Sequence, residues 1–511
     1  MTPTSTMNRI RLIFICLLTV SATAVAKENI EYEATAIVNA GSGDFAPYYM
    51  ASNRHGILTQ PVGGLLDVKA IRPFTEGKTF TWGYGVEVVG NASTSTDYLR
   101  CDTDQKALQP HSVSASGVWL QQLYGELKLH GCLITAGLKA YDSFMLNQRL
   151  SSGDFVESGN SRPIPELRMG FVDFQNIPLT KGWVQIAGVF SYGKTTDNHW
   201  LTDHYNYFDY HLAQDVYYTY KRIHFRTKPS ERFSVTIGGQ CAGQFGGSTK
   251  WYSYGSLVRE ETRGHSLKDM FEMFFPKAGT ESFVIGNHLG SWDLLARYRL
   301  RDNSEIKAYF EWPWEDGSGI GKMNGFDGIW GLEYKSARRA VINGAVIEYI
   351  DFTNQSGPIH WAPGDSPGTD LTSEATGGDD YYESMHYNGY THYGMSIGTP
   401  FIPSTLYNLD GHLNCDNSRI RGFHVGVEGS ITPALDYRVL FSHRKGFGTA
   451  RTPIITPKED TSAMVEANYN VEKVKGLAIR AQVAFDKGKI YGNNIGGLIS
   501  VSYKGNLSLG K

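Results

Sequence analysis

The feature that most constrains this chain is a two-residue alternation of apolar and polar side chains. It is clearest over residues 423–431 and 435–442, on either side of a short break at 432–434. Successive side chains of a β-strand point to opposite faces of a sheet. The two stretches therefore predict antiparallel strands, each apolar on one face and largely polar on the other. The apolar positions are Phe423, Val425, Val427, Ile431, Leu435, Tyr437, Val439 and Phe441.

The same pattern recurs along most of the chain, and its interruptions fall into two classes. Short turns at one end and long loops at the other are typical of outer-membrane barrels. We therefore predict an all-β fold, a transmembrane antiparallel β-barrel of about 16–18 strands with short periplasmic turns and long extracellular loops. The short breaks lie at 76–78, 130–131, 180–182, 229–231, 302–304, 336–338, 433–434 and 475–476, and the long ones at 92–116, 143–162, 194–214 and 353–390.

The first residues have the pattern of a secretory signal peptide. Arg9 and Arg11 precede an apolar run at 12–20, and Ala24-Val25-Ala26 supplies small residues for cleavage. The run is shorter than the ~20 residues that a membrane-spanning helix needs. We expect residues 1–26 to be a signal peptide and residues 27–511 to form one barrel in the outer membrane of a Gram-negative cell.

Composition agrees with this interpretation. The chain has 57 Gly, 30 Tyr, 25 Phe and 10 Trp, and aromatic enrichment suits strands and interfacial girdles. A formal net charge of -3 gives no support for nucleic-acid binding. Four cysteines follow the predicted leader, and an exported chain permits disulfides in any of three full pairings. They are Cys101, Cys132, Cys241 and Cys415.

Five local strings resemble the Wzi family of capsule-assembly proteins, and they lie in family order along the chain. They are FAPYYMASNRHG at 45–56, NSRPIPELR at 160–168 with PLTKGW at 178–183, DNHWL at 197–201 with DHYNY at 203–207, NHLGSWD at 287–293, and YNGY at 387–390 with IGTPF at 397–401.

The resemblance implies a lectin-like barrel of about 18 strands, in the range that outer-membrane barrels span. It implies a protein that binds capsular or surface polysaccharide and assists its assembly or attachment to the cell surface. The implied partners are that polysaccharide, outer-membrane lipid and other components of capsule export. A family branch with a periplasmic helical bundle near its start is a poorer match, since residues 28–38 predict a strand. The alternative function is an outer-membrane porin or glycan-uptake channel, which would differ by having an open lumen.

Two loops carry the side chains that sugars need. Aromatic faces stack on the C–H surfaces of sugars, while carboxylates, amides and Arg satisfy their hydroxyls. The alternative is that these tyrosines pack the loops together or form the aromatic girdle. The predicted carbohydrate-binding residues are Trp200, Tyr205, Tyr207, Tyr381, Tyr382, Tyr387 and Tyr390.

Charged residues at alternate strand positions are candidates for the lumen wall. They predict either a structural ladder of ion pairs or a selectivity filter. Near Pro163 and Pro165, the charged residues Arg162, Glu166 and Arg168 predict structural bracing, with a plugging role as the alternative. The candidate lumen charges are Asp293, Arg297, Arg299, Glu311, Glu333, Glu348, Glu428, Arg438, Arg444 and Arg480.

No motif predicts an enzyme. The G-x-S-x-G match at 364–368 has Pro363 before it and Pro367 after its serine, whereas a nucleophile elbow needs a strand followed by a helix. The 15 histidines form no H-E-x-x-H pattern. We expect no cofactor and no catalytic metal.

Overall fold

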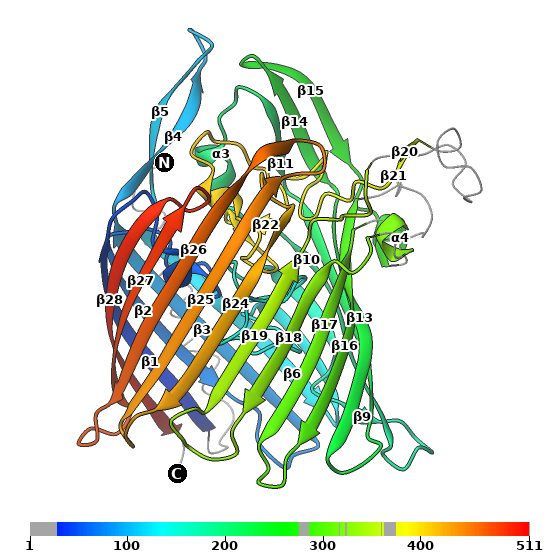
Figure 1. Ribbon diagram of the computed structural model, residues 1–511, viewed down its shortest axis with the longest axis vertical. Helices are drawn as coiled ribbons and strands as arrows, with labels where there is room; N and C mark the ends of the chain where they lie inside the picture. The colour runs from blue at the N-terminus through cyan, green and yellow to red at the C-terminus, as the bar shows by residue number, and fades with distance from the viewer. Residues whose placement is uncertain are drawn as a thin grey trace.

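The protein is a closed antiparallel β-barrel of eighteen strands (Figure 1). The computed structural model describes residues 28–274, 286–315, 317–321, 324–358, 360–361 and 375–509. The first and last strands, β1 and β28, close the barrel by pairing from Glu28 opposite Leu509 to Gly41 opposite Gly496. The predicted fold class is therefore confirmed. The expected signal peptide at 1–26 lies outside the described residues.

Each wall strand pairs with its neighbours along the chain, and β9 (Gln175–Asn176) adds a short pairing to β10. The wall strands are β1 (Glu28–Gly41), β2 (Gly63–Arg72), β3 (Phe80–Ser93), β6 (Gly117–Leu129), β7 (Cys132–Leu138), β8 (Pro165–Phe171), β10 (Val184–Lys194), β12 (Tyr217–Thr227), β13 (Phe233–Phe245), β16 (Asn287–Arg299), β17 (Glu305–Trp314), β18 (Gly328–Lys335), β19 (Gly344–Asp351), β24 (Ile420–Ser430), β25 (Leu435–Gly448), β26 (Pro453–Asn470), β27 (Leu477–Gly488) and β28 (Asn493–Leu509).

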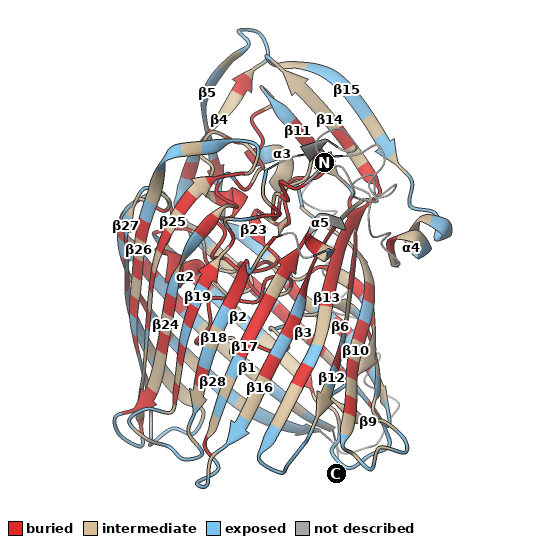
Figure 2. Ribbon diagram, turned by 45° about the vertical axis from the view of Figure 1, so that its right-hand side comes forward, coloured by how far each residue is buried: buried red, intermediate tan, exposed pale blue. Residues whose placement is uncertain are grey.

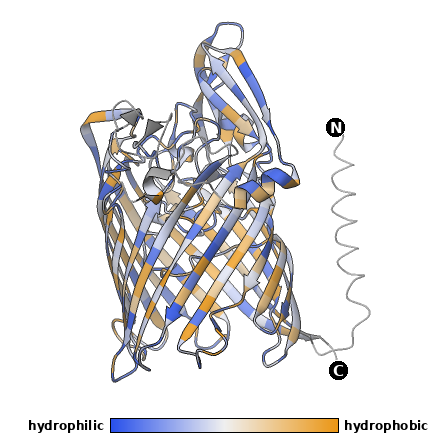
Figure 3. Ribbon diagram, turned by 90° about the vertical axis from the view of Figure 1, so that its right-hand side faces the viewer, coloured by the Kyte–Doolittle hydropathy of each residue, from blue (hydrophilic) through white to orange (hydrophobic). Residues whose placement is uncertain are grey.

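The alternation in the sequence separates the two faces of this wall. On β26, Val465 is 57% exposed on the outside, while its neighbour Glu466 is 2% exposed and faces the lumen. Exposed large apolar residues recur along the wall strands, and hydrophobic and hydrophilic residues alternate along the ribbon (Figure 3). An apolar outer face and a polar lumen are what a barrel in a lipid bilayer requires.

The two ends of the barrel differ. At the end where β1 begins and β28 finishes, eight connections join the strands, and each contains one of the short breaks predicted from the sequence. At the other end the connections carry most of the remaining structure, although 449–452 and 489–492 are short. These elements are β4 (Ser95–Asp102), β5 (Ala107–Ser114), β11 (Tyr210–Gln214), β14 (Gly247–Ser253), β15 (Ser256–Arg263), β20 (His360–Trp361), β21 (Ala375–Thr376), β22 (Thr391–His392), β23 (Met395–Ser396), α2 (Tyr48–Ala51), α3 (Trp200–His204), α4 (Leu267–Phe274), α5 (Gly317–Ile320) and the 3-10 turn η2 (Thr405–Tyr407).

Helices are short throughout the described part of the chain. None of them is long and apolar enough to cross a membrane. The described chain opens with strand β1, as the sequence of residues 28–38 predicts. The four cysteines of the described part are free thiols, so none of the three possible pairings is formed.

Three connections fold inward and fill the lumen at mid-height, where buried residues gather inside the wall (Figure 2). We call segments 42–62, 139–164 and 377–419 together the plug. Met50, Phe155 and Phe401, one from each segment, are fully buried. They belong to two apolar clusters that also include inward side chains of most wall strands. The plug is therefore packed against the wall as a core rather than lying loosely inside it.

Candidate functional site: the extracellular rim and the plug

Two hairpins and helix α3 stand above the barrel at the end with the long loops (Figure 1). Strand β14 pairs with both β11 and β15, and the β14–β15 hairpin turns through Tyr254 and Gly255, whose φ values of 47° and 69° are both positive. This two-residue turn matches the twist of antiparallel strands. The β4–β5 hairpin meets it where Lys106 Nζ donates to Ser256 Oγ at 2.7 Å. We call these two hairpins, α3 and residues 205–214 the extracellular rim.

An aromatic cluster lies at the centre of the rim. The Tyr205 ring is 5.1 Å from that of Tyr207 and 5.6 Å from that of Tyr252, centre to centre. Arg100 of the other hairpin places its guanidinium 5.1 Å from the Tyr207 ring. Tyr205 is fully buried and donates to the Asp209 carbonyl at 2.7 Å, whereas Tyr207 is half-buried. Burial raises the pKa of the Tyr205 phenol, so this hydroxyl stays a donor.

Trp200 begins helix α3 and is half-buried. Its indole stacks on the imidazole of His204, with 3.8 Å between ring centres and 16° between planes. Its edge lies against Gly394 of the plug, where any Cβ would meet the indole. One face of the indole is therefore covered, and the rest of the side chain borders the rim.

The rim also holds exposed aromatic residues that the predicted site did not include. Tyr254 is 77% exposed at the hairpin turn, and Tyr210 is 45% exposed with its ring 4.5 Å from that of His412. Trp251 is half-buried beneath the guanidinium of Arg259, which lies 4.6 Å from its ring. Three aromatic residues within 251–254, followed by Gly255, were the available sequence signal for this hairpin.

Three other predicted residues come together inside the barrel. Tyr381, Tyr382 and Tyr390 are buried in the plug. Tyr382 donates to the Phe155 carbonyl at 2.5 Å, and Tyr390 donates to the Val156 carbonyl at 2.9 Å. The Tyr381 ring lies 5.3 Å from that of Phe155. In this arrangement the three rings contact protein, which is the packing role that the sequence left open as the alternative.

Tyr387 is 1% exposed, between the plug and strand β11. Its carbonyl lies 2.9 Å from His211 Nε2, and burial raises the pKa of its phenol to about 12. Five of the seven predicted residues are thus buried, and only Trp200 and Tyr207 border the solvent without rearrangement. Carbohydrate binding by the seven stays a prediction.

Five of the wall charges predicted for the lumen are buried inside the barrel, namely Asp293, Glu311, Glu333, Glu348 and Arg444, and two of these carboxylates hold the plug. Backbone N–H groups of the plug donate to wall carboxylates, from Ser152 to Glu348 at 2.7 Å and from Phe155 to Glu311 at 3.1 Å. Buried backbone donors are costly to leave unpaired. These carboxylates therefore fix the height at which the plug sits.

The charged residues near Pro163 and Pro165 brace the same region. Arg168 forms ion pairs with Glu157 of the plug and with Glu166, the latter at 2.7 Å. Arg162 places its guanidinium 3.9 Å from the Trp119 ring of β6. Among the described residues, no group of three His, Cys, Asp or Glu side chains is arranged to hold a metal ion.

Comparison with known proteins shows the fold. No protein-family model and no curated protein matches the sequence. Among solved structures, the chain is similar to Wzi of Escherichia coli, described as an outer-membrane protein involved in group 1 capsule assembly and a carbohydrate-binding β-barrel. The TM-score is 0.54 at 11% identity, over 98% of this chain and 88% of that one.

Barrels of another kind also match. OccAB2 of Acinetobacter baumannii aligns at 11% identity with a TM-score of 0.47, over 94% of this chain and 98% of that one. OprD of Pseudomonas aeruginosa aligns at 10% identity with a TM-score of 0.43, over 95% and 96%. The fold is that of an outer-membrane β-barrel, and the protein belongs in the outer membrane, as the sequence predicts.

Proposed function

We propose that this protein binds capsular or surface polysaccharide at its extracellular rim and assists its assembly or attachment to the cell surface. The observation that carries the proposal is the rim itself, which presents half-buried and exposed rings beside Arg100, Arg259 and His412 above a filled lumen. Such rings can stack on sugar C–H faces while the charged groups bind hydroxyls. Wzi, a barrel of the same fold, binds carbohydrate.

The filled lumen favours binding over transport. A porin or glycan-uptake channel needs a continuous aqueous path, and here Met50, Phe155 and Phe401 lie fully buried in a plug that packs on the wall. Polysaccharide binding needs neither an open path nor a nucleophile, and we therefore propose a non-enzymatic role. The serine of the 364–368 motif lies outside the described residues.

The test is polysaccharide retention in a deletion strain, measured as cell-bound against shed material. The wild-type gene should restore retention, and a Trp200→Ala, Tyr254→Ala double variant should not. Trp183→Ala is the matched control, because Trp183 is 54% exposed next to a turn at the opposite end of the barrel. Equal retention by the double variant and the control would refute a binding role for the rim.

A further inference from the structure

A polar chamber lies beneath the plug, on the side away from the extracellular rim. Its volume is about 410 Å³, and its lining includes the plug residues Asn53 and Ser152 and the wall residues Ser500 and Ser502. A cavity of about 460 Å³ shares Arg149 and Arg480 with the chamber and reaches the strand ends at the β24–β25 turn. A third cavity of about 600 Å³ adjoins the second and reaches the β18–β19 turn. The chamber is therefore reached from the end of the barrel with the short turns. Small-molecule sites have volumes of roughly 300–1,000 Å³.

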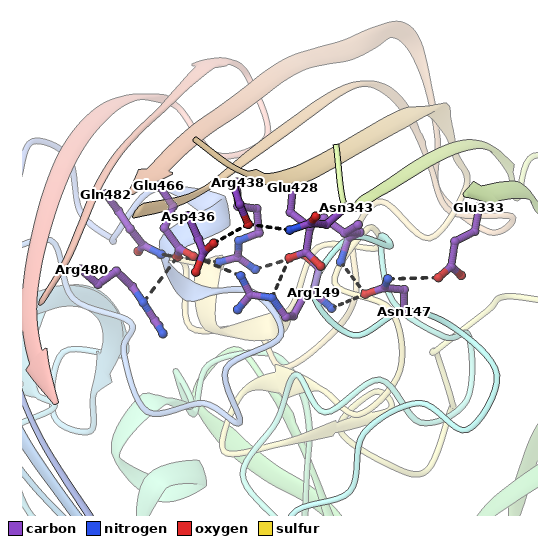
Figure 4. Close-up of polar contacts among 12 residues, drawn as sticks. Asn147, Arg149, Glu333, Asn343, Glu428, Asp436, Arg438, Glu466, Arg480 and Gln482 are labelled. Atoms are coloured by element: carbon purple, nitrogen blue, oxygen red, sulfur yellow. Dashed lines mark hydrogen bonds and ion pairs between the residues drawn. The ribbon is translucent and has the colours of Figure 1, made fainter. Parts of the chain in front are cut away.

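Four arginine side chains line one end of this chamber, and Figure 4 shows three of them, Arg149, Arg438 and Arg480, around Glu466. Arg438 donates to Glu466 at 2.8 Å, and Arg149 contacts the same carboxylate at 3.4 Å. Arg480 lies 3.9 Å from Glu466, and Arg54 reaches it through Gln482. Strands β25, β26 and β27 supply the wall residues, and the plug supplies Arg54 and Arg149.

The cations at this end outnumber the anions. Arg149 Nε also contacts a second carboxylate, that of Glu428, at 2.9 Å. The four arginines therefore face two carboxylates, which leaves two positive charges without a matching negative charge. The remaining charged groups that line the chamber lie on the wall strands β1, β2, β3 and β28, where they carry one net negative charge. They are Lys69, Lys504, Glu33, Asp67 and Glu87.

This charged cluster has a buried part and a part that the solvent reaches. The side chains of Glu466 and Arg438 are 2% and 12% exposed, whereas those of Arg149 and Arg480 are 49% and 38% exposed. Arg438 and Glu466 therefore form an ion pair that is largely shielded from water. The other two can offer N–H groups to a ligand in the chamber without giving up Glu466.

We propose that this chamber is a binding site for an acidic sugar, whose carboxylate lies between Arg149 and Arg480. Guanidinium groups bind carboxylates through paired N–H donors, and these charge-assisted bonds are stronger than neutral ones. The neighbouring Asn53, Ser152 and Ser500 supply partners for the sugar hydroxyls. A purely structural ladder of ion pairs would need no surplus of cations. The site is separate from the extracellular rim and does not depend on the function proposed for the rim.

The test is isothermal titration calorimetry of the full barrel in detergent micelles with digalacturonate. Binding should weaken on the order of tenfold in Arg149→Gln and again in Arg480→Gln, because each removes charge-assisted hydrogen bonds. Arg480→Gln keeps the other contacts of Glu466 and so leaves the wall intact. Arg299→Gln is the matched control, since Arg299 has the same 49% exposure but pairs with Glu305 at the barrel edge.

Several results would overturn the assignment. Equal affinity for the neutral disaccharide cellobiose would remove the role of the carboxylate. Competition by inorganic phosphate at the same concentration would show that the site takes any oxyanion rather than a sugar acid. An equal loss in Arg299→Gln would indicate a general charge effect. Weakened binding in Trp200→Ala would place the site at the rim, and unchanged binding is expected.

Discussion

Phe155 lies where the inward segments of the plug meet, and its removal should loosen the plug without disturbing the wall. The side chain is fully buried. Its ring lies 5.2 Å from that of Tyr382, 5.3 Å from that of Tyr381 and 5.5 Å from that of Phe352. Truncation of a buried Phe to Ala costs roughly 3–5 kcal/mol. Phe155→Ala should therefore raise the population of locally opened plug roughly 100- to 3,000-fold.

Hydrogen–deuterium exchange of the barrel in micelles measures this opening directly. Amides of the plug at 379–402 should lose two to three orders of magnitude of protection, and those of strands β25–β27 should keep theirs. Phe485→Ala is the matched control, because the same side chain is 44% exposed on the lipid-facing wall. Equal protection of 379–402 in both variants would refute the claim that the plug is held by this packing.

Three further predictions concern charge and redox state. Arg444→Met should lower the free energy of unfolding in urea by about 2 kcal/mol or more, because the buried guanidinium of Arg444 lies 3.9 Å from the Tyr48 ring. As a control, Arg421→Met at an exposed position should lower it by about 1 kcal/mol or less. Burial opposes the charge on His412, but its hydrogen bond to Asp410 raises the pKa of the imidazole overall. An NMR titration should place the pKa of His412 above about 6.5, and Asp410→Asn should lower that pKa. The stability contributed by the His412–Asp410 contact should be fully present below the pKa of His412 in the unfolded chain, and it should be lost as the pH rises through the higher pKa of His412 in the folded protein. Unfolding of the mature protein should expose four thiols to a colorimetric reagent, and a lower count would contradict the free state of the cysteines.

The sequence predicts the wall well because strand geometry is local. Alternation along 435–442 assigns Val439 to the lipid face and Arg438 to the lumen, and a break such as 433–434 marks a turn wherever it interrupts the pattern. Each of these signals depends on residues adjacent in the chain. Counting such breaks predicts about 16–18 strands, and the barrel has eighteen.

The plug could not be predicted in the same way, because it is fixed by contacts between residues far apart in the sequence. Tyr382 and Phe155 are joined by a hydrogen bond across 227 positions, and nothing near either residue indicates the partner. A tyrosine-rich loop has the same composition whether it faces a glycan or packs inside a barrel. The predicted sugar-binding set therefore divides between the rim, with Trp200, Tyr205 and Tyr207, and the interior.

The most direct test of polysaccharide binding at the rim is equilibrium binding of purified surface polysaccharide to the barrel in lipid nanodiscs, followed by biolayer interferometry. Wild-type protein should bind, and the Trp200→Ala, Tyr254→Ala double variant should bind at least about tenfold more weakly, since each lost aromatic contact contributes on the order of 1 kcal/mol. The Trp183→Ala control should bind as the wild type does. Absence of binding by the wild type, together with a steady conductance in planar bilayers, would contradict polysaccharide binding and identify the barrel as a channel.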